Sequence, residues 1–69
     1  MKLSARNCLK GTVTAIDKGA VNSTVQIDIG GGNTITAMIT NASVEELDLA
    51  IGKTAHAVIK ASEVIVGAD

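Results

Sequence analysis

The sequence predicts an all-β fold, a single mainly β domain of 69 residues with one short helix. Three observations carry this prediction. Apolar and polar residues alternate over residues 21–29, which is typical of a strand with one buried face. Residues 30–33 (Gly-Gly-Gly-Asn) then have the composition of a hairpin connection. Residues 43–46 (Ser-Val-Glu-Glu) fit the capping box of a helix start, a serine followed three residues later by a glutamate.

The remaining elements follow in chain order. A Thr-rich strand is expected before a turn at residues 17–20, and the helix should end at Gly52. Residues 61–63 form a tight corner before the last strand. The five expected strands are residues 8–17, 21–29, 34–40, 54–60 and 64–66. Five short strands with one helix between the third and the fourth predict a small OB-like barrel that occupies residues 1–69 as one domain.

The core must be built from small aliphatic side chains, because the sequence contains no Phe, Tyr or Trp. A domain of 69 residues buries only a modest fraction of its surface. One cysteine allows no internal disulfide, and one histidine cannot supply a structural zinc site. We therefore infer that self-association supplies the missing burial.

Charge and hydropathy argue against several classes of partner. The net charge is −1, and neither a basic tract nor an acidic tail is present, so nothing indicates a nucleic acid or a membrane surface as partner. No apolar run approaches the length of a membrane span. Residues 1–7 lack the apolar centre of a signal peptide, so we expect a cytoplasmic protein.

Three short runs concentrate hydrogen-bond donors where a predicted strand or helix begins or ends. They are residues 4–7 (Ser-Ala-Arg-Asn), 40–43 (Thr-Asn-Ala-Ser) and 60–62 (Lys-Ala-Ser), and none contains a carboxylate. Together they suggest a site for a small oxyanion that is bound by donors instead of by a metal ion. Each run also has a plain structural interpretation, namely a frayed terminus, a helix cap and a solvated lysine.

No residue set offers catalytic chemistry. His56 lacks an acid, cysteine or serine at catalytic spacing, and Glu45 and Glu46 point to different sides of a helix. Cys8, at the start of a strand, is expected to be buried and inert. We therefore expect a binding protein and not an enzyme.

In these donor runs and the segments between them, the chain resembles the molbindins, the small Mop proteins. Their TOBE-type molybdate-binding domain also occurs in molybdate transporter ATPases and molybdate-responsive regulators. The resemblance covers essentially the whole chain. The segments that carry it are residues 4–7, 9–11, 18–21, 39–47, 58–62 and 64–66.

The resemblance implies a five-stranded OB-like barrel with a strand exchanged between subunits. It also implies a homohexamer, a trimer of dimers, that stores molybdate or tungstate at subunit interfaces without an organic cofactor or a directly ligated metal. One subunit would supply Ser4 and Arg6 with the intervening Ala5. Its partner would supply Thr40, Ser43, Lys60 and Ala61, with Ser62 at the rim. A second class of site is expected at Gly19, Ala20, Val21 and Asn22, a segment that also reads as a simple turn.

Two other functions remain open from the sequence. The first is an OB-type nucleic-acid-binding module, which the absence of aromatic residues and the net charge of −1 both disfavour. The second is a structural oligomerisation module whose donor runs only cap helices and strand ends.

Overall fold

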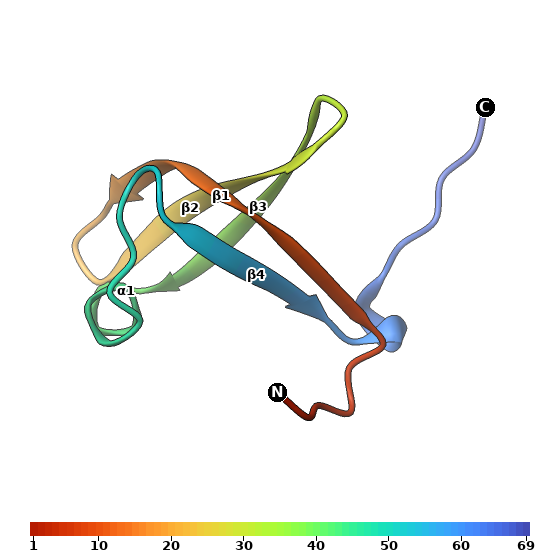
Figure 1. The fold of residues 1–69 in the computed structure, drawn as a ribbon, viewed down its shortest axis with the longest axis horizontal. Coiled ribbons are helices and arrows are strands. Elements are labelled where there is room, and N and C mark those ends of the chain that lie inside the picture. The colour runs from red at the N-terminus through yellow and green to blue at the C-terminus, as the bar shows by residue number, and fades with distance from the viewer.

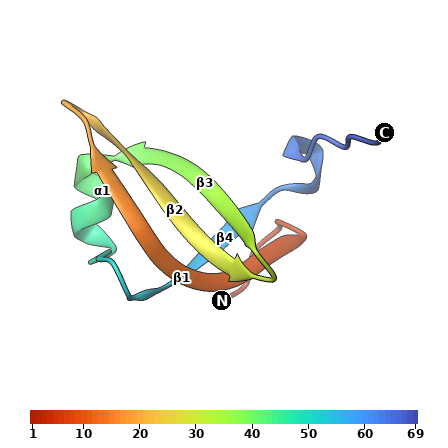
Figure 2. The same ribbon diagram turned by 90° about the horizontal axis from the view of Figure 1, so that it is seen from above.

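The computed structural model describes residues 1–69 as one four-stranded antiparallel sheet with the strand order β3-β2-β1-β4. A short helix lies between β3 and β4, and none of the helices has the length and hydropathy that crossing a bilayer requires. The sheet is curled into an open half-barrel (Figure 1, Figure 2). The elements are β1 (Asn7–Lys18), β2 (Asn22–Gly30), β3 (Asn33–Thr40), α1 (Asn41–Glu46), β4 (Thr54–Ile59) and a 3₁₀ helix, η1 (Ala61–Glu63).

The 12-residue strand β1 joins the two halves of the sheet. Its first half pairs with β4, with Asn7 opposite Ile59, and its second half pairs with β2, with Lys18 opposite Ser23. The change of partner falls near Gly11, where an added Cβ would lie 2.4 Å from the backbone oxygen of Asp28. Glycine at this position therefore lets β1 cross close to β2 and curl the sheet.

Replacing Gly11 by alanine is expected to lower the free energy of unfolding by about 1–3 kcal/mol, the usual cost of overpacking. The added methyl group would meet backbone atoms, which cannot move aside as a side chain can. Urea denaturation followed by far-ultraviolet circular dichroism measures the change. Gly67→Ala is the matched control, because no atom lies within 4 Å of its added Cβ. Equal stability of the two variants would contradict the explanation.

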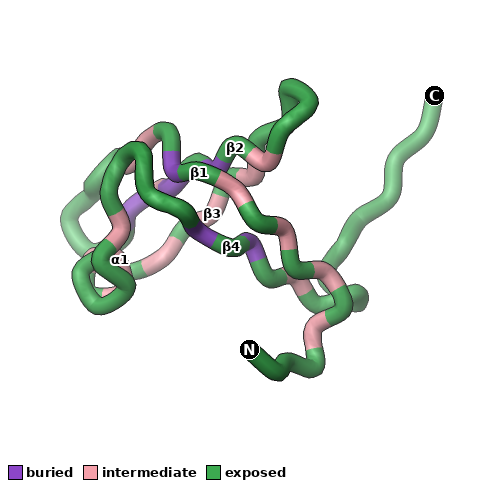
Figure 3. Tube along the Cα trace, in the orientation of Figure 1, coloured by how far each residue is buried: buried purple, intermediate pink, exposed green.

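The core lies on the concave face of the sheet and is small. Only six of the 69 residues are buried (Figure 3). Five of them are hydrophobic, and the sixth is Ser23. Seven partly buried aliphatic residues pack against this centre from β1, β2, β3, α1 and the segment after α1. The five hydrophobic core residues are Val13, Val25, Ile27, Ala55 and Ala57.

The alternation predicted for residues 21–29 is confirmed with a small shift at its start, and β3 alternates in the same way. Ile35, Ala37 and Ile39 share the inward face of β3, and residues 30–33 form the hairpin, in which Gly30 pairs with Asn33. The exception is Val21, which was expected to face inward and is 70% exposed. It lies in the loop before β2, and Ser23 takes the first inward position of that strand.

The mainly β class with one short helix is confirmed, but the fifth strand does not form within a single chain. Residues 64–69 follow η1 without regular structure and extend away from the sheet (Figure 1). Ile65 is 94% exposed and Val66 is 87% exposed. Because the chain leaves the sheet after η1, the outer edges of β3 and β4 both stay unpaired within a single chain.

The helix begins earlier than the capping-box pattern predicted. Thr40, and not Ser43, is the N-cap, and its Oγ1 accepts a hydrogen bond from the Ser43 amide at 3.0 Å. The helix ends at Glu46, so Gly52 belongs to a later turn and does not stop it. Strand β3 ends at Thr40, so the helix follows directly and takes its cap from this residue, three positions before Ser43.

Cys8 is exposed, which contradicts the expectation of a buried thiol. It lies on β1 opposite Val58, and the inward positions of this part of β1 are those of Leu9, Gly11 and Val13. Because side chains alternate along a strand, Cys8 must face the other side. His56 is exposed too, opposite Lys10 on the outer face.

Candidate functional site

The sheet pairing brings the first and third donor runs together. Because Asn7 pairs with Ile59, residues 4–6 precede β1 at the same end of the sheet where residues 60–62 follow β4 (Figure 1). The side chain of Asn7 reinforces this junction by donating from Nδ2 to the Ile59 carbonyl oxygen at 3.2 Å. Two segments more than fifty residues apart therefore form one local cluster, which we call the tail–corner cluster (residues 4–6 and 60–62).

The donors of the tail–corner cluster are free. Arg6 and Lys60 are exposed, and neither belongs to the one ion pair of the chain, which joins Lys53 to Asp48 at 2.6 Å. In that remote pair, the hydrogen bond and the charge of Lys53 lower the pKa of Asp48. Backbone amides of the cluster donate no hydrogen bond within the chain, and neither does the hydroxyl of Ser4 or of Ser62. The cluster therefore offers two cations and several unused N–H and O–H groups to a ligand.

One carboxylate lies close in sequence to this cluster. Glu63 ends η1, and its side chain is exposed without an ion-pair partner. Its amide donates to the Lys60 carbonyl oxygen at 2.9 Å, which closes the corner. The corner therefore contributes amides from Ala61 and Ser62, the two residues that precede Glu63.

The second donor run forms a hydroxyl pair at the junction of β3 and α1. Thr40 Oγ1 lies 2.8 Å from Ser43 Oγ and donates its proton to it, while accepting from the Ser43 amide. This arrangement leaves the Ser43 hydroxyl proton free for a ligand. Helix α1 has only six residues, so the hydroxyl groups and not a helix dipole are the relevant donors.

A single chain does not bring the hydroxyl pair to the tail–corner cluster. The two groups lie at opposite ends of the sheet in both views (Figure 1, Figure 2). Lys60 and Ala61 thus accompany Ser4 and Arg6 within one chain, whereas the resemblance had grouped them with Thr40 and Ser43. A site that uses all eight predicted residues requires donors from two chains.

The candidate second-site segment, residues 19–22, lies beside the hydroxyl pair. The Asn41 amide donates to the Val21 carbonyl oxygen at 2.8 Å, and Asn41 Nδ2 donates to the Gly19 carbonyl oxygen at 3.0 Å. Asn41 belongs to the second donor run but was assigned no role at the site, and its partner Ser23 was not predicted at all. The signal in the sequence was the polar Ser23 at an inward position of an otherwise apolar strand face.

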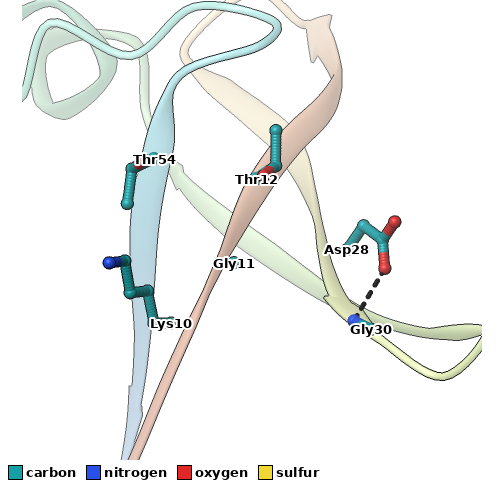
Figure 4. Close-up of a pocket in the computed structure, with 6 residues that line it drawn as sticks. All are labelled: Lys10, Gly11, Thr12, Asp28, Gly30 and Thr54. Atoms are coloured by element: carbon teal, nitrogen blue, oxygen red, sulfur yellow. Dashed lines mark hydrogen bonds between the residues drawn. The ribbon is translucent and has the colours of Figure 1, made fainter.

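A polar pocket of about 410 Å³ is lined by residues of β1, β2 and β4, where β1 crosses between the other two strands (Figure 4). None of the predicted site residues lines it. Figure 4 shows Lys10 and Asp28 on opposite sides of the pocket, and Asp28 Oδ1 accepts a hydrogen bond from the Gly30 amide at 2.8 Å. A carboxylate in the wall disfavours a dianion, so this pocket is not a candidate oxyanion site. No three His, Cys, Asp or Glu side chains gather into a possible metal-binding group.

An apolar groove of about 710 Å³ runs along the concave face, and 12 of its 15 lining residues are hydrophobic. Residues of β3 and β4 line its two sides, including Ile35 and Ile39 on one side and Ala57 and Ile59 on the other. Val25 and Ile27 of the core lie between them. The groove is thus the open seam of the half-barrel, where the two unpaired strand edges face each other.

Comparison with known proteins identifies this architecture. Residues 3–66 match the TOBE domain family. The chain belongs to this family. The match spans all four strands, both helices and the two donor groups.

Individual relatives place this TOBE domain among small molybdenum-related proteins. A Haemophilus influenzae protein described as a probable molybdenum-pterin-binding protein is 54% identical over 69 residues, which is the full length of both chains. The solved structure of MopII from Clostridium pasteurianum superposes with a TM-score of 0.89 at 45% identity, covering 97% of this chain and 100% of that one. The resemblance to the molbindins is therefore confirmed.

A third similarity concerns a structure with ligand. ModG, described as a cytoplasmic molybdate-binding protein and solved with molybdate bound, matches with a TM-score of 0.91 at 54% identity. The match covers 94% of this TOBE domain and 46% of the ModG chain.

Proposed function

We propose that this protein binds molybdate or tungstate reversibly in the cytoplasm, as a store or buffer of the oxyanion, and that it is not an enzyme. The observation that carries the proposal is the 54% identity and common fold shared with a protein solved with molybdate bound. The Haemophilus influenzae relative, which is described as a probable molybdenum-pterin-binding protein and aligns over the full length of the chain, also supports a binding function.

The chemistry of the donor groups fits this ligand. Molybdate is a tetrahedral dianion that is fully deprotonated near neutral pH, so it only accepts hydrogen bonds. Arg6 and Lys60 supply positive charge without a carboxylate partner, and charge-assisted hydrogen bonds are the stronger kind. The free hydroxyl proton of Ser43 supplies a neutral donor. Partly protonated phosphate would bring a proton that requires an acceptor, and among these groups only the hydroxyl oxygens can accept one.

The proposed site lies between two chains. Six donor positions come from the tail–corner cluster of one chain, and the hydroxyl pair of Thr40 and Ser43 comes from another. This division follows the single-chain geometry, in which the two groups lie at opposite ends of the sheet (Figure 1). Ligand binding then stabilises the assembly by mass action, because the complete site exists only when the chains are associated.

The same proposal includes an exchanged strand. Residues 64–66 are an exposed apolar segment, and the groove between β3 and β4 is an apolar slot with an unpaired strand edge on each side. A strand from a second copy would satisfy both edges and cover the core, closing the half-barrel into a five-stranded barrel. Reciprocal exchange gives a dimer, and three such dimers give the proposed hexamer.

Isothermal titration calorimetry with molybdate, tungstate and sulfate tests the function on protein whose mass in solution has been measured. We expect molybdate and tungstate to bind tightly and sulfate to bind at least a hundredfold more weakly. Concentration must be determined without absorbance at 280 nm, because the chain has no Trp or Tyr. An intact oligomer that gives no heat with any of the three anions would refute the proposal and favour a structural module.

Replacing Ser43 by alanine separates ligand donation from helix capping. Because Thr40 is the cap, Ser43→Ala is expected to change the melting temperature little but to weaken molybdate binding about 2- to 10-fold, the loss of one hydrogen bond. Thr40→Ala removes both the cap and the orientation of Ser43, so it should lower the melting temperature as well. Calorimetry and thermal unfolding measure the two effects. Unchanged binding in both variants would remove the hydroxyl pair from the site.

A further inference from the structure

Ser23 is the one buried polar residue of the chain, with 1% of its surface exposed. It occupies the first inward position of β2, two residues before the core residue Val25. Its Oγ donates to Asn41 Oδ1 at a short distance of 2.5 Å. A buried hydroxyl without a partner would be costly, so this bond fixes the orientation of the Asn41 side chain.

Asn41 holds the segment from residue 19 to residue 23 through three hydrogen bonds. Besides accepting from Ser23, it donates from Nδ2 to the Gly19 carbonyl oxygen at 3.0 Å and from its amide to the Val21 carbonyl oxygen at 2.8 Å. The loop is compact in itself, since the Gly19 amide donates to the Asn22 carbonyl oxygen at 2.8 Å. In the side chain of Asn41, Oδ1 and one N–H of Nδ2 are therefore already hydrogen-bonded within the chain.

Asn41 also adjoins the hydroxyl pair directly. It follows Thr40, whose side chain caps and orients Ser43, and Thr40 is itself paired with Asn22 across the β2–β3 ladder. The backbone that carries the hydroxyl pair is thus anchored from the loop side by Asn41 and from the sheet side by β2. Loss of the Asn41 side chain would leave the sheet anchor and, on the loop side, only the backbone bond from the Asn41 amide to Val21.

We propose that Ser23 and Asn41 form a positioning unit that fixes the Thr40–Ser43 hydroxyl pair and the loop of residues 19–22, and thereby sets the discrimination between tetrahedral oxyanions. This inference rests on the proposed function. Molybdate and sulfate carry the same charge and shape and differ in size. Donors held rigidly at one spacing favour one of them, whereas donors free to shift adapt to either.

The unit acts through the geometry of the hydroxyl pair and does not donate to the ligand. Positive charge at the site comes from Arg6 and Lys60, which belong to the other donor group and are untouched by a change at Ser23 or Asn41. Weakening the unit should therefore reduce the size-dependent part of binding more than the charge-dependent part. A merely structural role would lower stability without altering the preference between the two anions.

Ser23→Ala and Asn41→Ala test the unit in the full-length oligomer. Ser23→Ala is nearly isosteric and preserves the fold, so the test does not depend on the larger Asn41→Ala change. The matched control is Val25→Ala, which removes buried side-chain atoms from the same strand face without touching the hydrogen bonds of Asn41. Molybdate affinity is measured by calorimetry, alone and in competition with sulfate, at a temperature well below each melting point.

We expect Ser23→Ala and Asn41→Ala each to weaken molybdate binding about 3- to 10-fold and to lower the molybdate-to-sulfate affinity ratio. The double variant should be no worse than Asn41→Ala, because the only side-chain hydrogen bond of Ser23 is the one to Asn41, which Asn41→Ala already removes. Val25→Ala should lower the melting temperature and leave the ratio unchanged. If the unaltered protein binds molybdate but the ratio stays constant in both positioning variants, this inference alone is overturned. Absence of molybdate binding by the unaltered protein overturns the proposed function and the inference with it.

Discussion

Deletion of residues 64–69 is expected to dissociate the oligomer and to lower the melting temperature by on the order of 20 °C. In the isolated chain this segment contributes no hydrophobic stabilisation, because Ile65 is 94% exposed and Val66 is 87% exposed. Buried in the groove of a second copy, each large aliphatic side chain contributes about 1.5–3 kcal/mol. When the segment binds there, the apolar side chains that line the groove are also removed from contact with water.

Deletion of residues 67–69 alone is the matched control for this experiment. It removes Gly-Ala-Asp but keeps Val64, Ile65 and Val66, so it should retain the mass and the melting temperature of the full chain. Light scattering with refractive-index detection measures the mass of each variant in solution. If the longer deletion also retains the full mass, the apolar segment does not join the subunits, and the groove requires another occupant.

The sequence was sufficient for those elements whose partners are close along the chain. The β2–β3 hairpin could be predicted because alternation marks both strands and the glycine run marks the connection between them. The same reasoning misjudged Cys8, although period-two alternation with Leu9 and Val13 places it on the exposed face. That error came from applying the average burial of cysteine before applying the pattern.

Elements that depend on distant partners could not be derived in this way. Residues 64–66 have a strand-like composition, but a strand requires a pairing partner, and within a single chain they pair with neither free edge of the sheet, β3 or β4. The position of Lys60 beside Arg6 follows from the pairing of Asn7 with Ile59, a register that local patterns do not specify. The hydrogen bond between Ser23 and Asn41 joins residues 18 positions apart, so local sequence patterns could not predict it either.

Replacing Lys60 by alanine is expected to weaken molybdate binding about 10- to 100-fold while leaving the fold intact. The exposed ammonium has no hydrogen-bond or ion-pair partner in the chain, so its loss should move the melting temperature by no more than about 2 °C. A hydrogen bond to a charged group contributes about 1.5–3 kcal/mol, which corresponds to the expected loss of affinity. Calorimetry measures the binding, and thermal unfolding without ligand measures the stability.

Lys10→Ala controls for the change in net charge. Lys10 is also exposed and also without an ion-pair partner, but it lines the polar pocket and not the tail–corner cluster. Both variants shift the net charge from −1 by the same unit, so long-range attraction of the dianion falls equally in both. Affinity that falls only for Lys60→Ala therefore measures a local contact, and equal losses in the two variants would reduce the role of Lys60 to its contribution to net charge.

Lys60→Arg then distinguishes charge from shape at the same position. Arginine keeps the positive charge but replaces a compact ammonium by a planar guanidinium with fixed donor directions. If Lys60 acts mainly as a charge, Lys60→Arg should recover most of the affinity lost in Lys60→Ala. If the ammonium must fit among the amides of Ala61 and Ser62, the arginine variant should bind nearly as weakly as the alanine variant. The second outcome is the one we expect, because Ala61 and Ser62 directly follow Lys60 at the corner, and the fixed donor directions of a guanidinium differ from those of the compact ammonium that would share the ligand with their amides.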